Sequence, residues 1–299
     1  MNEKDWTLLI TIFDEGNLNH AAKKLGISQP SLTYRIRELE KEFNLKIFIR
    51  GNGVVKFTKE GILLVDYAKS MSSELSQLKD QLYEINQPGI GILKISASDN
   101  FANAELPDIL SVFHKLYPAI KFNIVSVSLN HILEELSHAE THIALFRTDL
   151  NWNGPRLFLR EDPICLVSKK TITFSDIPQL PRVTFILSPN AEKEDTSWWN
   201  EYFSVPPNIA ISTNRLDTCI KMVKRGFGYA LFPMHQQQIK NFQQQNLYVI
   251  PLYHKNGTPH HVKLFAYYRE EVMDITIVKT FIEFLEKYFA LPLSSKSIL

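Results

Sequence analysis

Apolar residues recur every three or four positions on both sides of a short turn in NLNHAAKKLGISQPSLTYRIRELEKEF, residues 17–43. This spacing is typical of helices that bury one face. Asn17 and Ser28 are residue types that favour helix N-caps, and Pro30 suits the first turn of a helix because no N–H is needed there. Gly26 can adopt the left-handed backbone that ends a helix before a tight turn. The pattern therefore predicts a helix-turn-helix.

The second of these helices is polar and basic on the side that its apolar stripe does not use. Hydroxyl, amide and guanidinium groups are the ones that read base edges and bind phosphates in a major groove. We therefore predict that this face binds DNA, and that a solvated helix of some other helical domain is the alternative. The candidate residues are Ser28, Gln29, Pro30, Ser31, Thr33, Tyr34, Arg35 and Arg37. We expect Gln29 and Ser31 to face bases, and the arginines to bind phosphates.

Two short β-prone runs follow, at residues 47–50 and 54–57. Gly51-Asn52-Gly53 joins them and is a hairpin turn signal. A hairpin that carries Arg50 and Lys56 can reach backbone phosphates or the minor groove as a wing. The sequence therefore predicts a winged helix-turn-helix, an α domain with a small β wing, over residues 1–58.

A long helical pattern occupies residues 59–86, with Thr58 as its cap and Pro88-Gly89 as its end. Its apolar residues alternate in steps of four and three, which is the spacing of a coiled-coil seam. We predict that residues 59–88 form a linker helix that pairs two subunits; a helix packed by one face on its own domain is the alternative. The seam residues are Leu64, Ala68, Met71, Leu75, Leu78, Leu82 and Ile85.

From Gly91 onward, strand-like runs alternate with helical patterns, which predicts an α/β domain over residues 89–299. The expected strands are 92–96, 122–127, 143–146, 163–167, 183–187, 209–211, 229–232 and 262–268. The expected helices are 104–116, 131–139, 216–225 and 275–289.

Small molecules bind α/β sheets beyond the carboxyl ends of strands and at helix N-termini. Singly, each polar residue at such a position is better explained as a cap or loop group, but as a set they predict a pocket. The set is Ser98, Asp99, Asn100, Ser128, Arg147, Ser188, Thr213, Asn214 and Phe232. Asp99 disfavours a simple dianion, whereas Asp99 and Arg147 together would suit an amino acid or a related metabolite. Asp99 as a mere helix cap is the alternative.

Charge is unevenly distributed along a chain whose net charge is only +1. Residues 20–59 contain nine basic and three acidic residues, so the remainder carries a net charge of −5. A basic module on a mildly acidic body is typical of a nucleic-acid reader with a separate sensing part.

Other classes of protein find little support in the sequence. The start MNEKDW lacks the pattern of a secretory signal, no apolar run reaches about 18 residues, and two cysteines cannot form a disulfide framework. We therefore expect a cytoplasmic protein without a membrane partner. The histidines lack metal-ligand spacing, and nucleophile elbows and glycine-rich phosphate loops are missing. We expect no metal, no cofactor, no catalytic residues and no enzymatic activity.

The order AAKKLGISQPSLTYRIRELE, then KIFIR, then KFTKEG resembles the N-terminal domain of LysR-type transcriptional regulators. In that family Ser-Gln-Pro-Ser/Ala-Leu opens the recognition helix, and Leu-Phe-x-Arg precedes the wing; residues 47–50 read Ile-Phe-Ile-Arg. The chain departs from the family at Tyr34, where an arginine is common, and places Arg35 one residue later. Length and layout extend the resemblance to the whole chain.

The resemblance implies a two-lobed effector-binding domain similar in fold to periplasmic binding proteins. Lobe 1 would comprise about 91–162 and 263–295, and lobe 2 about 163–262. It also implies a double-stranded DNA operator, a small-molecule effector, homodimers that assemble into homotetramers, and RNA polymerase as a further candidate partner.

Two rival functions are open. The first is a regulator of the same family that senses oxidation of Cys165 and Cys219. The second is a solute-binding protein of a transporter, which the N-terminal helix-turn-helix opposes.

Overall fold

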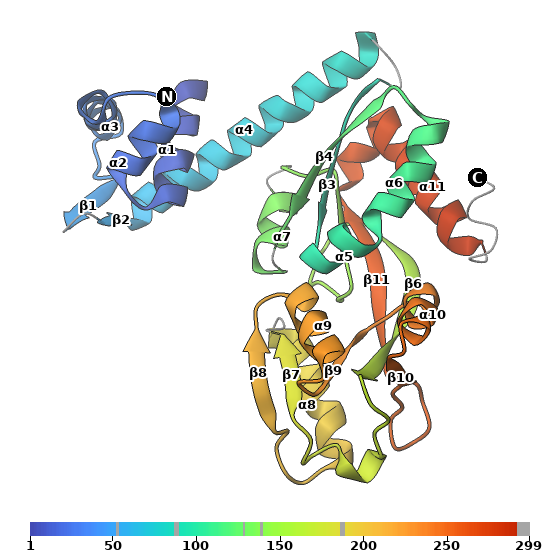
Figure 1. The fold of residues 1–299 in the computed structure, drawn as a ribbon. Helices are drawn as coiled ribbons and strands as arrows, with labels where there is room; N and C mark the ends of the chain where they lie inside the picture. The colour runs from blue at the N-terminus through green and yellow to red at the C-terminus, as the bar shows by residue number, and fades with distance from the viewer. Residues whose placement is uncertain (52–53, 87–89, 128, 138–139, 186–188, 292–299) are drawn as a thin grey trace. The chain divides into compact units, whose positions relative to one another are not determined.

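The computed structural model describes residues 1–51, 54–86, 90–127, 129–137, 140–185 and 189–291 (Figure 1). Contacts divide the chain into two compact units, each considered by itself below. One unit comprises Met1–Pro88 with Ser137–Glu140, and the other comprises Gly89–Leu136 with Thr141–Leu299. None of the helices in these described ranges has the length and apolar character that crossing a bilayer requires.

The first unit contains the predicted helix-turn-helix, hairpin and long helix. Its elements are α1 (Glu3–Glu15), α2 (Leu18–Leu25), α3 (Gln29–Glu42), β1 (Phe48–Gly51), β2 (Val54–Phe57) and α4 (Lys59–Asn86). The predicted caps are confirmed: Asn17 accepts hydrogen bonds from two N–H groups of α2, and Ser28 accepts one from the first turn of α3. Gly26 ends α2 at a φ of 66°, which a residue with a β-carbon adopts only at a cost.

The hairpin is antiparallel, with Phe48 opposite Phe57 and Gly51 opposite Val54. Residues 52 and 53 of its predicted turn lie outside the described residues. The N–H of Val55 donates to the carbonyl oxygen of Gly16 at 3.0 Å, which fixes the hairpin to the turn between α1 and α2.

The long helix has the predicted bounds, and Thr58 caps it by accepting a hydrogen bond from the N–H of Gly61 at 2.9 Å. A β-carbon on Gly61 would lie 1.9 Å from the carbonyl oxygen of Ile47, so the close approach of α4 to the hairpin requires glycine there.

The second unit is built on a mixed sheet with the strand order β4-β3-β5-β11-β6-β9-β7-β8, in which β10 also pairs with β6. The strands are β3 (Gly91–Ala97), β4 (Ile120–Ser126), β5 (Ile143–Phe146), β6 (Arg156–Ser168), β7 (Arg182–Phe185), β8 (Ile209–Thr213), β9 (Tyr229–Pro233), β10 (Tyr248–Pro251) and β11 (His261–Tyr268). The first part of β6, up to Pro163, pairs with β11, and the part from Ile164 pairs with β9. A single strand is therefore shared by the two halves of the domain, its two lobes.

Helices cover both faces of each half of the sheet. They are α5 (Asp99–Ala104), α6 (Leu106–Leu116), α7 (Leu129–Ser137), α8 (Pro189–Tyr202), α9 (Leu216–Arg225), α10 (Gln236–Gln244) and α11 (Thr276–Ala290), with short 3-10 turns η1 (Phe174–Asp176) and η2 (Glu270–Asp274). In the first half, α6 and α11 pack on one face and α7 packs on the other. In the second half, α9 and α10 pack on one face, and α8 packs on the other through Trp198 and Trp199. This is the predicted α/β architecture.

The structure corrects several element boundaries. The helix predicted over residues 104–116 is α6, which begins at Leu106. Ala104 is instead the last residue of α5, and Glu105 between the two helices has a φ of −135°, which is not helical. The strand predicted at 163–167 is the second part of the longer β6. The sequence reading also missed α10 and β10.

Candidate functional site

The exposed surface of α3 contains most of the residues predicted to bind DNA. Leu32, Ile36 and Leu39 are buried against the rest of the first unit. The opposite side is exposed at Ser28, Gln29, Pro30, Ser31, Tyr34 and Arg37, whereas Thr33 and Arg35 are half-buried. Tyr34 is 65% exposed, so an aromatic ring stands where the resembled family often has an arginine.

Arg35 does not project freely from α3. Its Nε lies 2.6 Å from Asp5 Oδ1 and its Nη2 lies 2.7 Å from Asp5 Oδ2, a bidentate ion pair that ties α3 to α1. The sequence reading placed Arg35 with the phosphate-binding residues. Phosphate binding by Arg35 stays a prediction, and the carboxylate partner inside the domain disfavours it.

The predicted wing is the hairpin of β1 and β2, which contains two further basic residues. Lys56 is exposed on β2, and Arg50 pairs through its backbone with Val55. The unit therefore contains both a polar helix face on α3 and a hairpin with basic residues, and their contact with DNA stays a prediction.

The exposed apolar side of α4 differs in part from the predicted seam. Ala68 is fully buried and Leu64 is half-buried in the core formed with α1, so these two residues stabilise the domain itself. Met71 and Leu75 are half-buried, whereas Leu78 and Leu82 are 49% and 50% exposed. Ile85 lies in α4, but its side chain is outside the described part of the structure. Near the start of the helix the exposed apolar residues are instead Ile62, Leu63 and Tyr67.

In the second unit, the structure brings two of the predicted ligand-binding segments together. Ser98 is the N-cap residue of α5, with Asp99 and Asn100 in the first turn. Thr213 and Asn214 precede α9, and the Thr213 hydroxyl accepts a hydrogen bond from the N–H of Arg215 at 3.3 Å. Arg215 Nη1 lies 3.7 Å from Asp99 Oδ2, so the two segments face each other. Ser128 and Ser188 lie outside the described residues.

Phe232 and Arg147, which were predicted to line the ligand pocket, have buried side chains that contact other residues of the domain. Phe232 is 3% exposed and packs against Phe242 in the core of the second half, so it does not line a cleft. Arg147 is buried and pairs with Glu105 and Asp162, the latter at 2.8 Å between Nε and Oδ2. The guanidinium of Arg147 thus already has two carboxylate partners inside the domain, and its role as the partner of a ligand carboxylate stays a prediction that this pairing disfavours.

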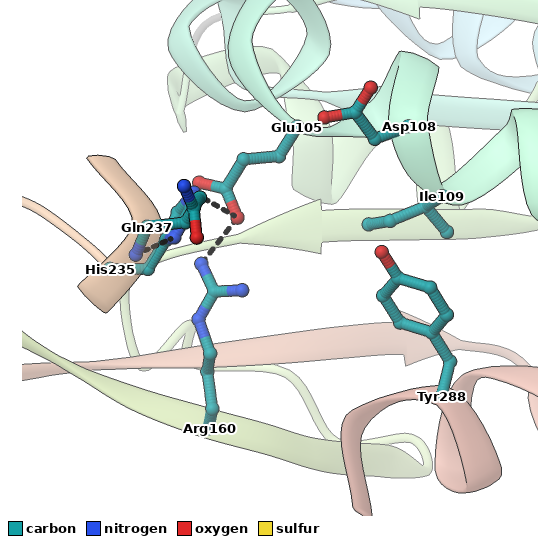
Figure 2. Close-up of a pocket in the computed structure, with 7 residues that line it drawn as sticks. All are labelled: Glu105, Asp108, Ile109, Arg160, His235, Gln237 and Tyr288. Carbon is teal, nitrogen blue, oxygen red and sulfur yellow. Dashed lines mark hydrogen bonds and ion pairs between the residues drawn. The ribbon is translucent and has the colours of Figure 1, made fainter. Parts of the chain in front are cut away.

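Arg147 belongs to a buried ionic network at the point where β6 passes between the two halves. Glu105 pairs with both Arg147 and Arg160, and Asp162 also pairs with both arginines. Figure 2 shows Glu105 pointing between Arg160 and His235, whose Nε2 lies 3.9 Å from a Glu105 oxygen. The network therefore joins the start of α6, the residue that follows β5, the strand β6 and the start of α10.

A pocket of about 170 Å³ opens beside this network (Figure 2). It lies between the first turn of α6, the first turn of α10 and the end of α11. Its lining residues are Glu105, Asp108, Ile109, Arg160, His235, Gln237 and Tyr288. None of these was predicted, although an Arg-Glu-Asp run in an otherwise apolar strand was a visible signal of buried polar groups on β6.

The two carboxylates of the network stay ionised although they are buried. Burial acts to raise the pKa of Glu105, but Arg147 and Arg160 outweigh it and the net pKa is lowered. The pKa of Asp162 is lowered in the same way. Burial also lowers the pKa of His235, more than Glu105 raises it, so the neutral imidazole is favoured.

The cysteines of the oxidation-sensing alternative are inert in this environment. Cys165 and Cys219 are free thiols and fully buried in the core of the second half. Burial raises the pKa of Cys165 to about 12 and that of Cys219 to about 11. Reactive cysteines have lowered pKa values and access to solvent.

Comparison with known proteins assigns both parts of the chain to one family. Residues 4–62 match the description "Bacterial regulatory helix-turn-helix protein, lysR family", and residues 86–290 match "LysR substrate binding domain". The HTH-type transcriptional regulator YraN of Bacillus subtilis is 30% identical over 286 residues, which are 96% of this chain and 98% of that protein.

Solved structures support the fold over the full length. The LysR family transcriptional regulator CbnR matches with a TM-score of 0.70 at 16% identity, over 98% of this chain and all of that one. CbnR in complex with its target DNA matches with a TM-score of 0.68 at 16% identity, over 96% of this chain and 99% of that one.

We predict that Glu105→Gln destabilises the second unit by about 3–5 kcal/mol at pH 7, because it leaves buried guanidinium groups without a full counter-charge. The pKa of Glu105 is lowered in the folded state. Its contribution is therefore complete above its unfolded-state pKa, about 4.3, and is lost as pH falls through the folded-state pKa. Denaturant unfolding should show the gap between wild type and variant shrinking below about pH 4. Glu161→Gln on the exposed side of β6 is the control and should change little; a similar effect of both variants would contradict this role of Glu105.

We further predict that neither cysteine reacts with an aromatic disulfide reagent in the native protein at pH 8. With the raised pKa values, the thiolate fraction is about one in a thousand or less. Both thiols should react after unfolding in denaturant, which serves as the positive control. Rapid native-state labelling of either residue would revive the oxidation-sensing alternative.

Proposed function

The chain belongs to the LysR family of bacterial helix-turn-helix transcriptional regulators, and on that premise we propose that a small zwitterionic effector held between Asp99 and Arg215 controls its binding to an operator. It is a DNA-binding regulator and not an enzyme. The observation that carries the proposal on the effector is the Arg215–Asp99 ion pair between two predicted ligand-binding segments.

The DNA-binding step uses the exposed face of α3. Gln29 and Ser31 are exposed near the start of the helix, where side chains meet base edges in helix-turn-helix proteins. Arg37 on the same helix and Lys56 and Arg50 on the wing supply positive charge for phosphates. The relative CbnR has been solved with its target DNA, which supports this mode of action.

Two copies of the chain pair through the outward side of α4. Leu78 and Leu82 are exposed, and Met71 and Leu75 precede them on the same side of the helix and are half-buried. Together they form an apolar stripe whose exposure to water is unfavourable. Two DNA-binding units held by such a pair would match an operator of two half-sites. Tetramers, contact with RNA polymerase and a cytoplasmic location stay predictions from the sequence.

The proposed effector site is defined by the two opposite charges at the starts of α5 and α9. Asp99 and Arg215 are 61% and 50% exposed at the side chain, and exposed ion pairs contribute little to stability. A ligand with both an ammonium and a carboxylate group can replace their weak mutual contact with two charge-assisted hydrogen bonds. Asn100, Ser98, Thr213 and Asn214 lie beside this pair and supply amide and hydroxyl groups for the rest of the ligand.

The proposed effector is still the zwitterion predicted from the sequence, but its carboxylate would bind Arg215 and not Arg147. The Arg147 side chain is buried between two carboxylates. The Arg215 side chain is half exposed; it lies opposite Asp99 and also pairs with the exposed Asp217 at 3.0 Å, a contact that solvent screens. A simple dicarboxylate would meet Arg215 but would place its second charge near Asp99, which repels it.

We predict that Leu78→Asp disrupts the α4 pairing, because it places an unpaired charge in an apolar seam where each buried leucine contributes about 1.5–3 kcal/mol. Analytical ultracentrifugation should show smaller assemblies than for the wild type. Ser72→Asp introduces the same charge at an exposed position outside the seam and is the control. If Leu78→Asp sediments like the wild type, the subunits pair elsewhere.

We predict that an α-amino acid, found by a thermal-shift screen of the twenty L-amino acids and succinate, binds the wild type. In titration calorimetry Asp99→Asn and Arg215→Gln should each weaken its binding about tenfold to a hundredfold, since a hydrogen bond to a charged group contributes about 1.5–3 kcal/mol. Asp108→Asn and Arg225→Gln remove the same charges from exposed positions on α6 and α9 and are the matched controls.

The outcome separates the alternatives for this site. Equal weakening by the controls would indicate a general electrostatic effect and not a specific contact. Stabilisation by succinate in place of the amino acids would contradict the zwitterion proposal, and the family assignment would stand unchanged.

A further inference from the structure

Asp5 occupies an unusual place for a carboxylate. It lies in the first turn of α1, where the apolar face of the helix continues through Leu9 and Ile12, and it is 1% exposed. One of its oxygens accepts a hydrogen bond from the N–H of Asn2 at 2.8 Å, as part of a capping box. The carboxylate is therefore held in position by its own helix before any contact with α3 is considered.

The partner of this carboxylate is a guanidinium on the DNA-binding helix. Arg35 meets both oxygens of Asp5 at 2.6 and 2.7 Å, the fork geometry that fixes both distance and orientation. The Arg35 side chain is 40% exposed, so it lies at the edge of the helix surface and within reach of solvent. The hydrogen bonds from Arg35, with burial acting against them, hold the pKa of Asp5 below its usual range.

A DNA phosphate would have to compete with Asp5 for this guanidinium. Moving Arg35 to a phosphate would leave a buried carboxylate without its counter-charge, a loss that a single solvent-exposed phosphate contact does not offset. Arg37, two residues along the same helix, is exposed and has no ion-pair partner among the described residues. Arg37 can therefore bind a phosphate without breaking an ion pair, whereas Arg35 cannot, although the sequence gives no sign of this difference.

We propose that Asp5 is a positioning residue that withholds Arg35 from DNA, lowering sequence-independent affinity while it holds α3 at a fixed place on α1. The affinity that remains depends more on the exposed side chains of α3 that meet bases. This device rests on the DNA-binding function but not on the effector site.

The test measures the salt dependence of binding to a mixed-sequence 30-base-pair duplex by the full-length protein, using fluorescence anisotropy between 50 and 200 mM NaCl. Each phosphate contact contributes about 0.9 to the slope of log K against log salt. Asp5→Asn keeps the size of the side chain and an acceptor for Asn2 but removes the charge that holds Arg35. It should tighten binding at 50 mM salt and steepen the slope by about 0.9.

Two further variants make the result specific. The double variant Asp5→Asn with Arg35→Gln should return to the wild-type slope, because the released guanidinium is gone. Arg37→Gln, the matched control on the same helix, should make the slope shallower by about 0.9. A melting curve for each variant separates loss of folding from loss of contact.

Three results would overturn the proposal. One is an unchanged slope in folded Asp5→Asn. Another is a double variant whose slope is as shallow as that of Arg37→Gln, which would mean that Arg35 already contacts a phosphate in the wild type. The last is a uniform fall in affinity with unchanged slopes in both Asp5 variants, which is the signature of a structural role alone. Failure of Arg37→Gln to change the slope would instead count against the proposed use of α3 in DNA binding.

Discussion

The buried ionic network on β6 is the constraint on which the arrangement of the second unit depends. β6 ends its pairing with β11 at Pro163 and pairs with β9 from Ile164 onward, so both halves of the domain are built on one continuous strand. Arg160 and Asp162 stand immediately before this crossing. Arg160 pairs with Glu105 from the start of α6, and Asp162 pairs with Arg160 and with Arg147. Buried charges are tolerated only when they are paired, because an unpaired one costs several kcal/mol. The start of α6 and the crossing strand must therefore keep their relative positions.

Short-range rules explain what the sequence predicted well. Asn17, Ser28 and Thr58 act within one turn of their own helices, and α4 ends at Asn86 as the sequence predicts. The wing and the α/β rhythm also follow from local patterns. The start of α6 was predicted at Ala104 and not at Leu106, and nothing local to the sequence shows that the Glu105 side chain pairs with Arg147 and Arg160, which are distant in sequence. α10 and β10 were missed because a glutamine-rich segment and a four-residue strand carry weak apolar periodicity.

Charge was the least predictable property of the candidate sites. Composition shows how many arginines a segment has, but the carboxylates that they meet are set by the tertiary fold. Arg35 and Arg147 pair with buried carboxylates, whereas Arg215, which the sequence did not single out, pairs with the exposed carboxylates of Asp99 and Asp217. One signal was available: Asp5 lies on the apolar face of α1, and a carboxylate in that position needs a partner from another element.

The second unit contains two kinds of ion pair, one buried and one exposed, which differ in how much free energy their disruption costs. The network of Glu105, Arg147 and Asp162 is buried and would be expensive to open. The pair between Asp99 and Arg215 is exposed, so solvent already screens it and little free energy is lost when its partners turn to another ligand. A ligand that replaces this pair therefore loses little binding free energy to breaking it. Most of the free energy of its own contacts is then available for binding and for any conformational change near α5 and α9. A ligand-controlled regulator needs this distribution, because a ligand shifts an equilibrium only by the difference in its affinity for the two states. The contact that changes must therefore be weak, while the strand that connects the two halves stays in place.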